Sequence, residues 1–296
     1  MCRSEEAMKG AFRRIVVATL AVSAGAACHV GSSLERLTEA RRLSADLQVN
    51  FTKATGAASK AVMADTDEAS AAFAREAEQA KQAVDKEAGE LKPLLDGLGY
   101  SDEAGLLEVF LKRFGEYRAL DRTILELAVE NTNLKAQRLS FGPAGEAVDA
   151  FREAVEGVVP LDPKDTWRVT ALVATAVSNL RQIQVLQAPH IAEADDARMT
   201  RMEVQMQTSE AAARSALGTL GALVQPASRP RLTSASAALD RFIAVNAQIT
   251  ALSRRNTNVR SLALSLNEKG KLTAACEDSL RALRDRLAAR GFAGTR

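Results

Sequence analysis

Apolar residues recur along this chain with the spacing of long amphipathic helices. In the first half, Leu120, Ile124, Leu127, Asn131 and Leu134 follow one another in steps of 4, 3, 4 and 3. Such steps place residues on one side of an α-helix and are typical of helices packed at a shallow angle. Alternating β-branched residues, which would predict strands, do not recur along the chain. The pattern therefore predicts an all-α fold.

The same pattern returns 125 residues later. Compared without gaps, residues 114–145 and 239–270 share nine identities in 32 positions, and both contain the triplet Asn-Thr-Asn. A match of this length within one chain predicts the duplication of one helical unit. The first asparagines of the triplets, Asn131 and Asn256, are predicted to lie on a helix seam where an apolar residue is expected.

Turn residues divide each copy into four predicted helices. In the first copy they cover residues 32–63, 68–96, 103–140 and 145–156, and in the second 164–187, 196–225, 232–267 and 273–290. Gly, Pro and Asp separate them. Long helices joined by short loops predict two tandem antiparallel four-helix bundles. The predicted domains are a signal peptide at 1–27, a first unit at 28–157, a linker at 158–163 and a second unit at 164–296.

The N-terminus has the features of an export signal. Arg13 and Arg14 precede an apolar run at residues 15–27, which ends in small residues before Cys28. This run is shorter than the roughly 20 residues that a bilayer-spanning helix needs. The order of these features predicts a secretory signal. Cys28 is the expected lipidation site if the segment resembles a bacterial lipoprotein signal; free export and an uncleaved anchor are the alternatives. We expect a periplasmic or membrane-attached protein of the bacterial cell envelope.

Charge and composition exclude some classes of function. The net charge is only +2, and aromatic residues make up 4% of the chain. Basic residues form no long stripe interleaved with aromatics, so we expect no nucleic-acid partner. The two histidines, His29 and His190, lie far apart in the sequence, and common metal, haem, phosphate-loop and hydrolase motifs are absent. We therefore expect no metal, no cofactor and no enzymatic activity.

The triplets allow a structural and a functional interpretation. In the structural one, Asn131 and Asn256 set the register of the bundle seam, because a buried Asn disfavours misaligned packing. In the functional one, polar side chains near each triplet bind a solute, and the arginines attract a carboxylate. The candidate ligand-binding residues are Asn133, Arg138, Asn258 and Arg260. The presence of the triplet in both copies favours the structural interpretation for Asn131 and Asn256.

One family shares these helical features. Tyr117, Ile124, Leu127 and Ala128 in the third helix are followed by a polar step containing Asn and by a turn into a last helix. Each half of the chain thereby resembles the four-helix-bundle sensory domain of methyl-accepting chemotaxis receptors. The resemblance implies a periplasmic bundle, often dimeric, that senses small solutes near the ends of its first and last helices.

The chain departs from that family in carrying two bundles and in lacking a second apolar segment and a cytoplasmic coiled coil. We therefore expect a detached sensory or binding module rather than a complete receptor. Its expected partners are a small solute, a membrane signalling protein and a second copy of the chain. The alternative function is that of a structural or adaptor lipoprotein acting through protein contacts.

Overall fold

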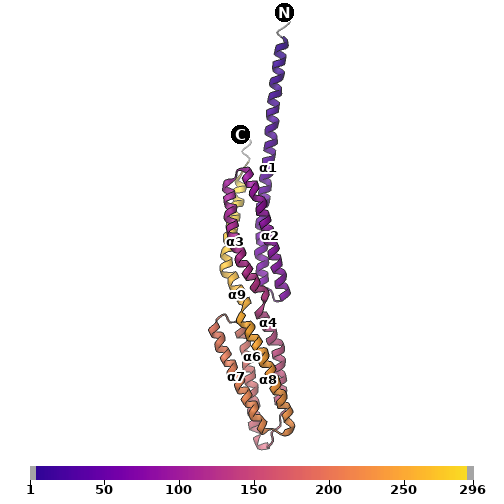
Figure 1. Ribbon diagram of the computed structural model, residues 1–296, viewed down its shortest axis with the longest axis vertical. Coiled ribbons are helices and arrows are strands. Elements are labelled where there is room, and N and C mark those ends of the chain that lie inside the picture. The colour runs from indigo at the N-terminus through magenta and orange to yellow at the C-terminus, as the bar shows by residue number, and fades with distance from the viewer. Residues whose placement is uncertain (1–4, 292–296) are drawn as a thin grey trace. The chain divides into compact units, whose positions relative to one another are not determined.

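The computed structural model describes the backbone of residues 5–291 and the side chains of residues 33–291. Figure 1 shows that this part of the chain is built from helices, which confirms the predicted all-α fold. The elements are α1 (Glu5–Met63), α2 (Asp67–Leu98), α3 (Ser101–Glu130), α4 (Thr132–Leu139), the π-helical turn η1 (Ser140–Ala144), α5 (Gly145–Glu156), the 3-10 turn η2 (Pro163–Asp165), α6 (Thr166–Ala192), α7 (Asp196–Leu223), the 3-10 turn η3 (Pro226–Ser228), α8 (Arg229–Arg255), α9 (Thr257–Leu264), the π-helical turn η4 (Ser265–Lys269) and α10 (Gly270–Ala289).

The expected export segment, residues 1–27, and the expected lipidation site Cys28 lie outside the residues whose side chains are described. Within the described part of the chain, none of the helices combines the length and the apolar character that a membrane crossing requires.

The chain forms two compact units, and neither is continuous in sequence. Unit 1 comprises Met1–Ser59, Phe73–Arg122 and Asn267–Arg296. Unit 2 comprises Lys60–Ala72 and Thr123–Leu266. The structure therefore divides the chain differently from the predicted units 28–157 and 164–296, whose border was placed at the linker 158–163.

The difference arises because the two repeats exchange their last helices. Unit 1 contains most of the described part of α1, with most of α2 and α3, from the first repeat, and α10 from the second. Unit 2 contains α6, α7 and α8 from the second repeat and α4 and α5 from the first. The expected turn at residues 141–145 is instead the π-helical turn η1, which continues the helix through Pro143. A π-helical turn absorbs an irregular residue without reversing the chain.

Apolar side chains fill the centre of each unit. In unit 1, Phe51 makes edge-to-face contacts with Phe110, Phe114 and Tyr117, with ring centroids 5.2–6.0 Å apart. Leucines from α1, α2, α3 and α10 surround these rings. In unit 2, α6 packs against α7 and α8, and α5 packs against α8. Phe151, Leu180 and Phe242 lie in its core.

The pattern of buried positions is repeated in the two halves of the chain. Buried Phe51 and Leu91 in the first repeat correspond to buried Leu180 and Leu220 located 129 residues later. Buried Tyr117 corresponds to buried Phe242 located 125 residues later. The two offsets differ because the connections between the helices differ in length. Equivalent positions of the two units can therefore be compared directly.

The buried stripe of α3 differs from the predicted seam. It consists of Leu107, Phe110, Phe114, Tyr117, Asp121, Ile124 and Ala128, again in steps of 3 and 4. Only Ile124 is shared with the predicted seam. The predicted third helix, continuous to residue 140, also ends earlier, because Asn131 separates α3 from α4. Conversely, α6 continues through Pro189 to Ala192, beyond the end predicted at residue 187.

Candidate functional site

Asn131 and Asn256 interrupt helices rather than occupy them. Both residues have φ 53° and ψ 39°, the left-handed region, and they are the non-glycine residues with positive φ in the described chain. Asn adopts this conformation more readily than most residues because its short polar side chain can form local hydrogen bonds. The two copies thus introduce the same kink between α3 and α4 and between α8 and α9.

The threonines and the second asparagines of the triplets cap each other's helices. The backbone N–H of Thr132 donates to Oγ1 of Thr257, and that of Thr257 donates to Oγ1 of Thr132, both at 3.1 Å. The N–H groups of Asn133 and Asn258 likewise donate to the other residue's Oδ1 at 3.1 Å. N–H groups in the first turn of a helix have no partner within the helix. Each repeat therefore supplies the caps that the other lacks, and we call this arrangement the Asn-Thr-Asn crossover.

The amides of the crossover are largely committed to protein partners. Nδ2 of Asn133 donates to Oδ1 of Asn256 at 2.9 Å and to the carbonyl of Ile191 at 2.6 Å. Nδ2 of Asn258 donates to Oδ1 of Asn131 at 2.8 Å. These bonds leave little of the asparagine amides for a solute, so the geometry favours a structural role for all four asparagines.

The two candidate arginines do not join the crossover. Arg138 is exposed, and its guanidinium pairs with Asp67 at 3.1 Å. Arg260 is also exposed. The four candidate ligand-binding residues are thus not gathered into one cavity: Asn133 and Asn258 lie inside the crossover, and the arginines lie on the surface.

Sequence reasoning missed a charged cluster in the core of unit 1. Asp121 is fully buried; its Oδ2 lies 2.8 Å from Nζ of Lys81 and its Oδ1 lies 2.7 Å from Nζ of Lys269. Lys81, 2% exposed, also pairs with Glu78 at 2.9 Å. Burial lowers the pKa of Lys269 and raises the pKa of neighbouring Tyr117. Asp121 sits on the 3-and-4 stripe between Tyr117 and Ile124, and that placement is the signal that could have revealed it.

Unit 2 has a different polar network at the end of α6. His190, fully buried, contacts Oγ of Ser253 through Nδ1 at 2.8 Å and Oε1 of Glu203 through Nε2 at 2.9 Å. Arg254 forms two bonds to the Glu203 carboxylate, each at 2.8 Å. The Arg254 guanidinium, and to a smaller extent His190, holds the pKa of Glu203 below its usual range.

A serine, a histidine and a carboxylate in contact invite comparison with a hydrolase triad. Here Ser253 is fully buried, and its hydroxyl donates to the carbonyl of His190 at 2.7 Å. A nucleophile must reach the substrate and pass its proton to the base. The observed arrangement instead ties α6, α7 and α8 together.

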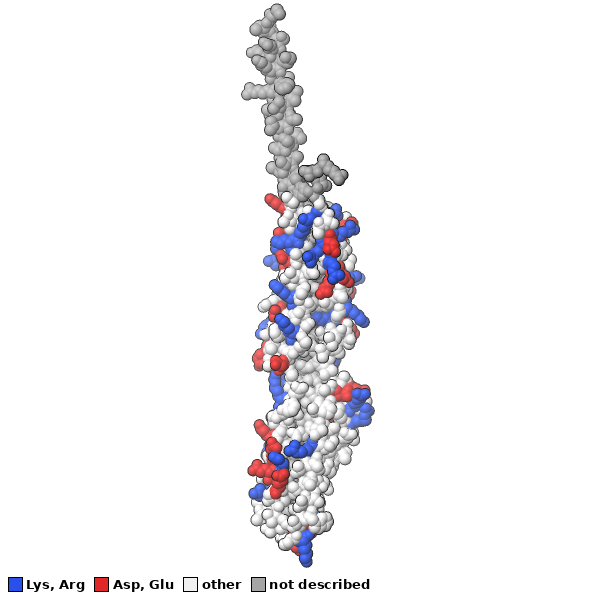
Figure 2. All heavy atoms as spheres, turned by 180° about the vertical axis from the view of Figure 1, so that it is seen from behind, with Lys and Arg blue, Asp and Glu red and all other residues white. Residues whose placement is uncertain are grey.

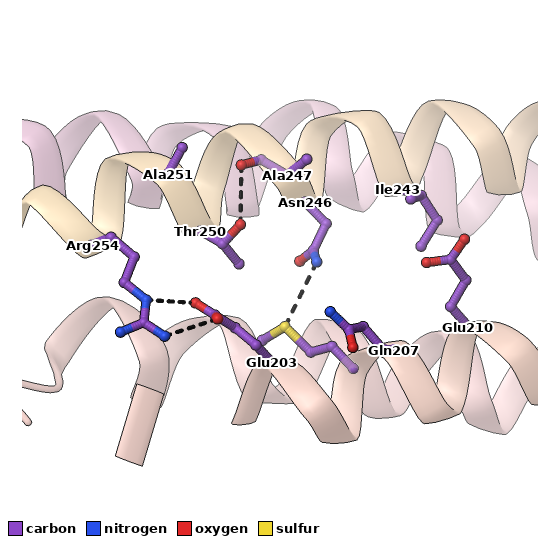
Figure 3. Close-up of a pocket in the computed structure, with 10 residues that line it drawn as sticks. Glu203, Gln207, Glu210, Ile243, Asn246, Ala247, Thr250, Ala251 and Arg254 are labelled. Atoms are coloured by element: carbon purple, nitrogen blue, oxygen red, sulfur yellow. Dashed lines mark hydrogen bonds and ion pairs between the residues drawn. The ribbon is translucent and has the colours of Figure 1, made fainter. Parts of the chain in front are cut away.

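A groove in unit 2 lies beside this network, between α7 and α8. Its volume is about 370 Å³. Figure 3 shows Gln207 and Glu210 from α7 facing Ile243 and Asn246 from α8, with the Glu203–Arg254 pair at one end. The groove floor is held in place, because Asn246 accepts from Gln187 at 2.9 Å and donates to the sulfur of Met206 at 3.6 Å.

One face of the molecule carries charges of both signs. Figure 2 shows basic and acidic side chains interspersed over the face that it presents. The charged residues that line the groove, Glu203, Glu210 and Arg254, are likewise of both signs.

Comparison with known proteins identifies no relative. No protein-family model, no curated protein and no solved structure matches this chain. Fold and site define the class as an all-α protein in which two helical-bundle repeats exchange their last helices.

Proposed function

We propose that this protein is a non-catalytic binding module of the bacterial cell envelope, which binds a small solute in the groove between α7 and α8. The observation that carries this proposal is the groove itself. It has the volume of a small-molecule site and combines charged, amide and apolar side chains. The envelope location rests on the signal-like N-terminal segment, and a lipid anchor on Cys28.

The proposed mechanism is a small shift of one packed helix against another. Glu203 and Arg254 join α7 to α8, and His190 joins α6 to the same carboxylate. A solute that spans the groove adds contacts between α7 and α8 and favours one of their packings. Helix shifts of this kind transmit binding in many signalling proteins. The signal would pass to a membrane partner, as the resemblance to chemoreceptor sensory domains implies.

A thermal-shift survey of amino acids, organic acids and amines tests this proposal. A solute present at 100 times its Kd stabilises the folded protein by about 2.7 kcal/mol, which raises Tm by several degrees. If the solute binds in the groove, the Tm shift disappears when Ala247 is replaced by Trp, because the larger side chain fills the groove. If no compound in the survey shifts Tm, the protein is not a solute-binding module.

Two exposed apolar residues favour the alternative function of a structural or adaptor protein. Phe141 is 82% exposed and Leu266 is 71% exposed. They occupy equivalent positions of the π-helical turns η1 and η4, 125 residues apart. A partner protein that covers them would bury apolar surface, which favours association. Replacement of both by Ser would then abolish binding to the partner protein.

A further inference from the structure

The groove of unit 2 occupies the place that the charged cluster fills in unit 1. The offset of 129 residues between the repeats aligns Lys81 with Glu210 and Glu78 with Gln207, both on α7. The offset of 125 residues aligns Asp121 with Asn246 and Arg118 with Ile243, both on α8. All four residues of unit 2 line the groove.

Unit 1 fills this place with the side chain of Lys81. Lys81 is 2% exposed, and its ammonium group lies 2.8 Å from Asp121 and 2.9 Å from Glu78. Burying an ammonium group is costly unless acceptors surround it. Unit 1 therefore shows that this position of the bundle can hold an alkylammonium group.

Unit 2 lacks that lysine but keeps acceptors around the same place. Glu210 replaces Lys81, and Gln207 and Asn246 replace the two carboxylates of unit 1. Glu210 accepts from Arg214 through Oε1 at 2.9 Å, which leaves its Oε2 as an acceptor, and the side chain of Gln207 has no hydrogen-bond partner among the described residues. In Figure 3 both side chains reach into the space between the helices. The change from unit 1 to unit 2 replaces two cations, Lys81 and Arg118, with Glu210 and Ile243, and a groove is open at this place.

The other charges at the groove disfavour an anionic ligand. Arg254 already donates to Glu203, to Thr200 and to Asp196. A carboxylate would have to break these bonds before it could pair with the guanidinium. Ile243 and Ala247 supply apolar contact for a hydrocarbon chain.

From these observations we infer that the groove between α7 and α8 binds a primary aliphatic amine. Its ammonium group donates to Glu210 and Gln207, and its chain lies against Ile243 and Ala247. The ligand thus supplies from outside what Lys81 supplies in unit 1. This inference rests on the proposed function and names the class of solute.

Titration calorimetry of the whole chain with 1,5-diaminopentane, pentylamine and sodium pentanoate tests the inference. The two amines bind, and pentanoate, with the same number of carbon atoms, does not. Glu210→Gln weakens amine binding by roughly tenfold or more, because a charge-assisted hydrogen bond is lost. Glu153→Gln, at an exposed position of α5, changes the net charge equally and leaves the affinity unchanged.

A second variant copies the buried ion pair of unit 1 into unit 2. Glu210→Lys combined with Asn246→Asp introduces the Lys81–Asp121 pair into unit 2, fills the groove with a tethered ammonium and abolishes amine binding. The Tm of this variant, compared with that of the unaltered protein, shows that it is folded. Amine binding that survives both Glu210→Gln and the double variant would overturn the inference.

The outcomes separate the inference from the proposed function. If pentanoate or another non-amine solute binds, and the double variant abolishes that binding, the groove is a solute site but the amine assignment is wrong. If no solute binds the unaltered protein, both are wrong.

Discussion

Asparagine at positions 131 and 256 combines two properties that few residues share. It adopts the left-handed conformation, and its amide both donates and accepts hydrogen bonds. Oδ1 of Asn131 accepts from Asn258, and Nδ2 of Asn256 donates to the carbonyl of Glu193 at 2.7 Å. The two sites are not identical, since Nδ2 of Asn131 is buried and has no partner among the described residues. Conformation and capping together explain why the triplet is present twice.

The left-handed backbone at Asn131 makes a prediction about substitutions. Asn131→Ala and Asn131→Gly both remove the amide, but only Gly adopts positive φ without strain. We expect the Ala variant to be less stable than the Gly variant by about 1–2 kcal/mol, measured by urea unfolding. Equal stability of the two variants would show that the kink carries no strain.

Asp121 makes a second prediction. Asp121→Asn leaves Lys81 and Lys269 buried beside a neutral amide, so we expect a loss of about 3–5 kcal/mol in the free energy of unfolding. Asp85, which pairs with Arg118 and is 43% exposed at its side chain, provides the matched control. Asp85→Asn should cost less than about 1 kcal/mol. Similar losses in the two variants would mean that the buried cluster adds nothing beyond a surface ion pair.

At the scale of elements, α7 and α8 are held together by polar groups at one end and separated by the groove farther along. Glu203 on α7 accepts from Arg254 on α8 and from His190 on α6. One carboxylate therefore links three helices beside the groove. The packing of these helices should depend on the ionisation of Glu203.

The lowered pKa of Glu203 predicts acid sensitivity of this link. Its usual value is 4.5, and the Arg254 guanidinium lowers the value in the folded state. A carboxylate whose pKa is lower in the folded state contributes stability above its unfolded pKa, and loses it as the pH falls through the folded value. As the pH is lowered below 4.5, the Tm of the Glu203→Gln variant should therefore fall less than the Tm of the unaltered protein. The exposed Glu153→Gln serves as the control and should follow the unaltered protein.

At the scale of the whole molecule, each unit depends on both repeats. Unit 1 requires α10 from the second repeat, and unit 2 requires α4 and α5 from the first. The last helix of each repeat contributes core residues such as Phe151 in unit 2 and Leu283 in unit 1. Each repeat supplies the first three helices of one unit. The fourth helix of that unit comes from the other repeat.

The exchange predicts how separated repeats behave. Residues 33–160 and 161–291, produced as separate chains and mixed, should form a stable one-to-one complex, because each supplies the fourth helix of the other's unit. Light scattering after size-exclusion chromatography gives the mass of the complex. Two separate repeats that remain folded monomers after mixing would contradict the exchange.

The sequence by itself determined the helical class and the duplication, because the helical spacing of apolar residues returns 125 residues later. It also marked Asn131 and Asn256, since a repeated polar triplet in an apolar helix is conspicuous. It did not determine the buried face of α3, since only Ile124 of the predicted seam lies on the buried stripe. Only the tertiary structure decided which unit each last helix completes. The apolar stripes of α5 and α10 do not by themselves name the bundle that they enter, and in the structure a left-handed residue and a π-helical turn precede each of these helices. The groove was likewise invisible in the sequence, because it depends on whether side chains of two distant helices fill the space between them.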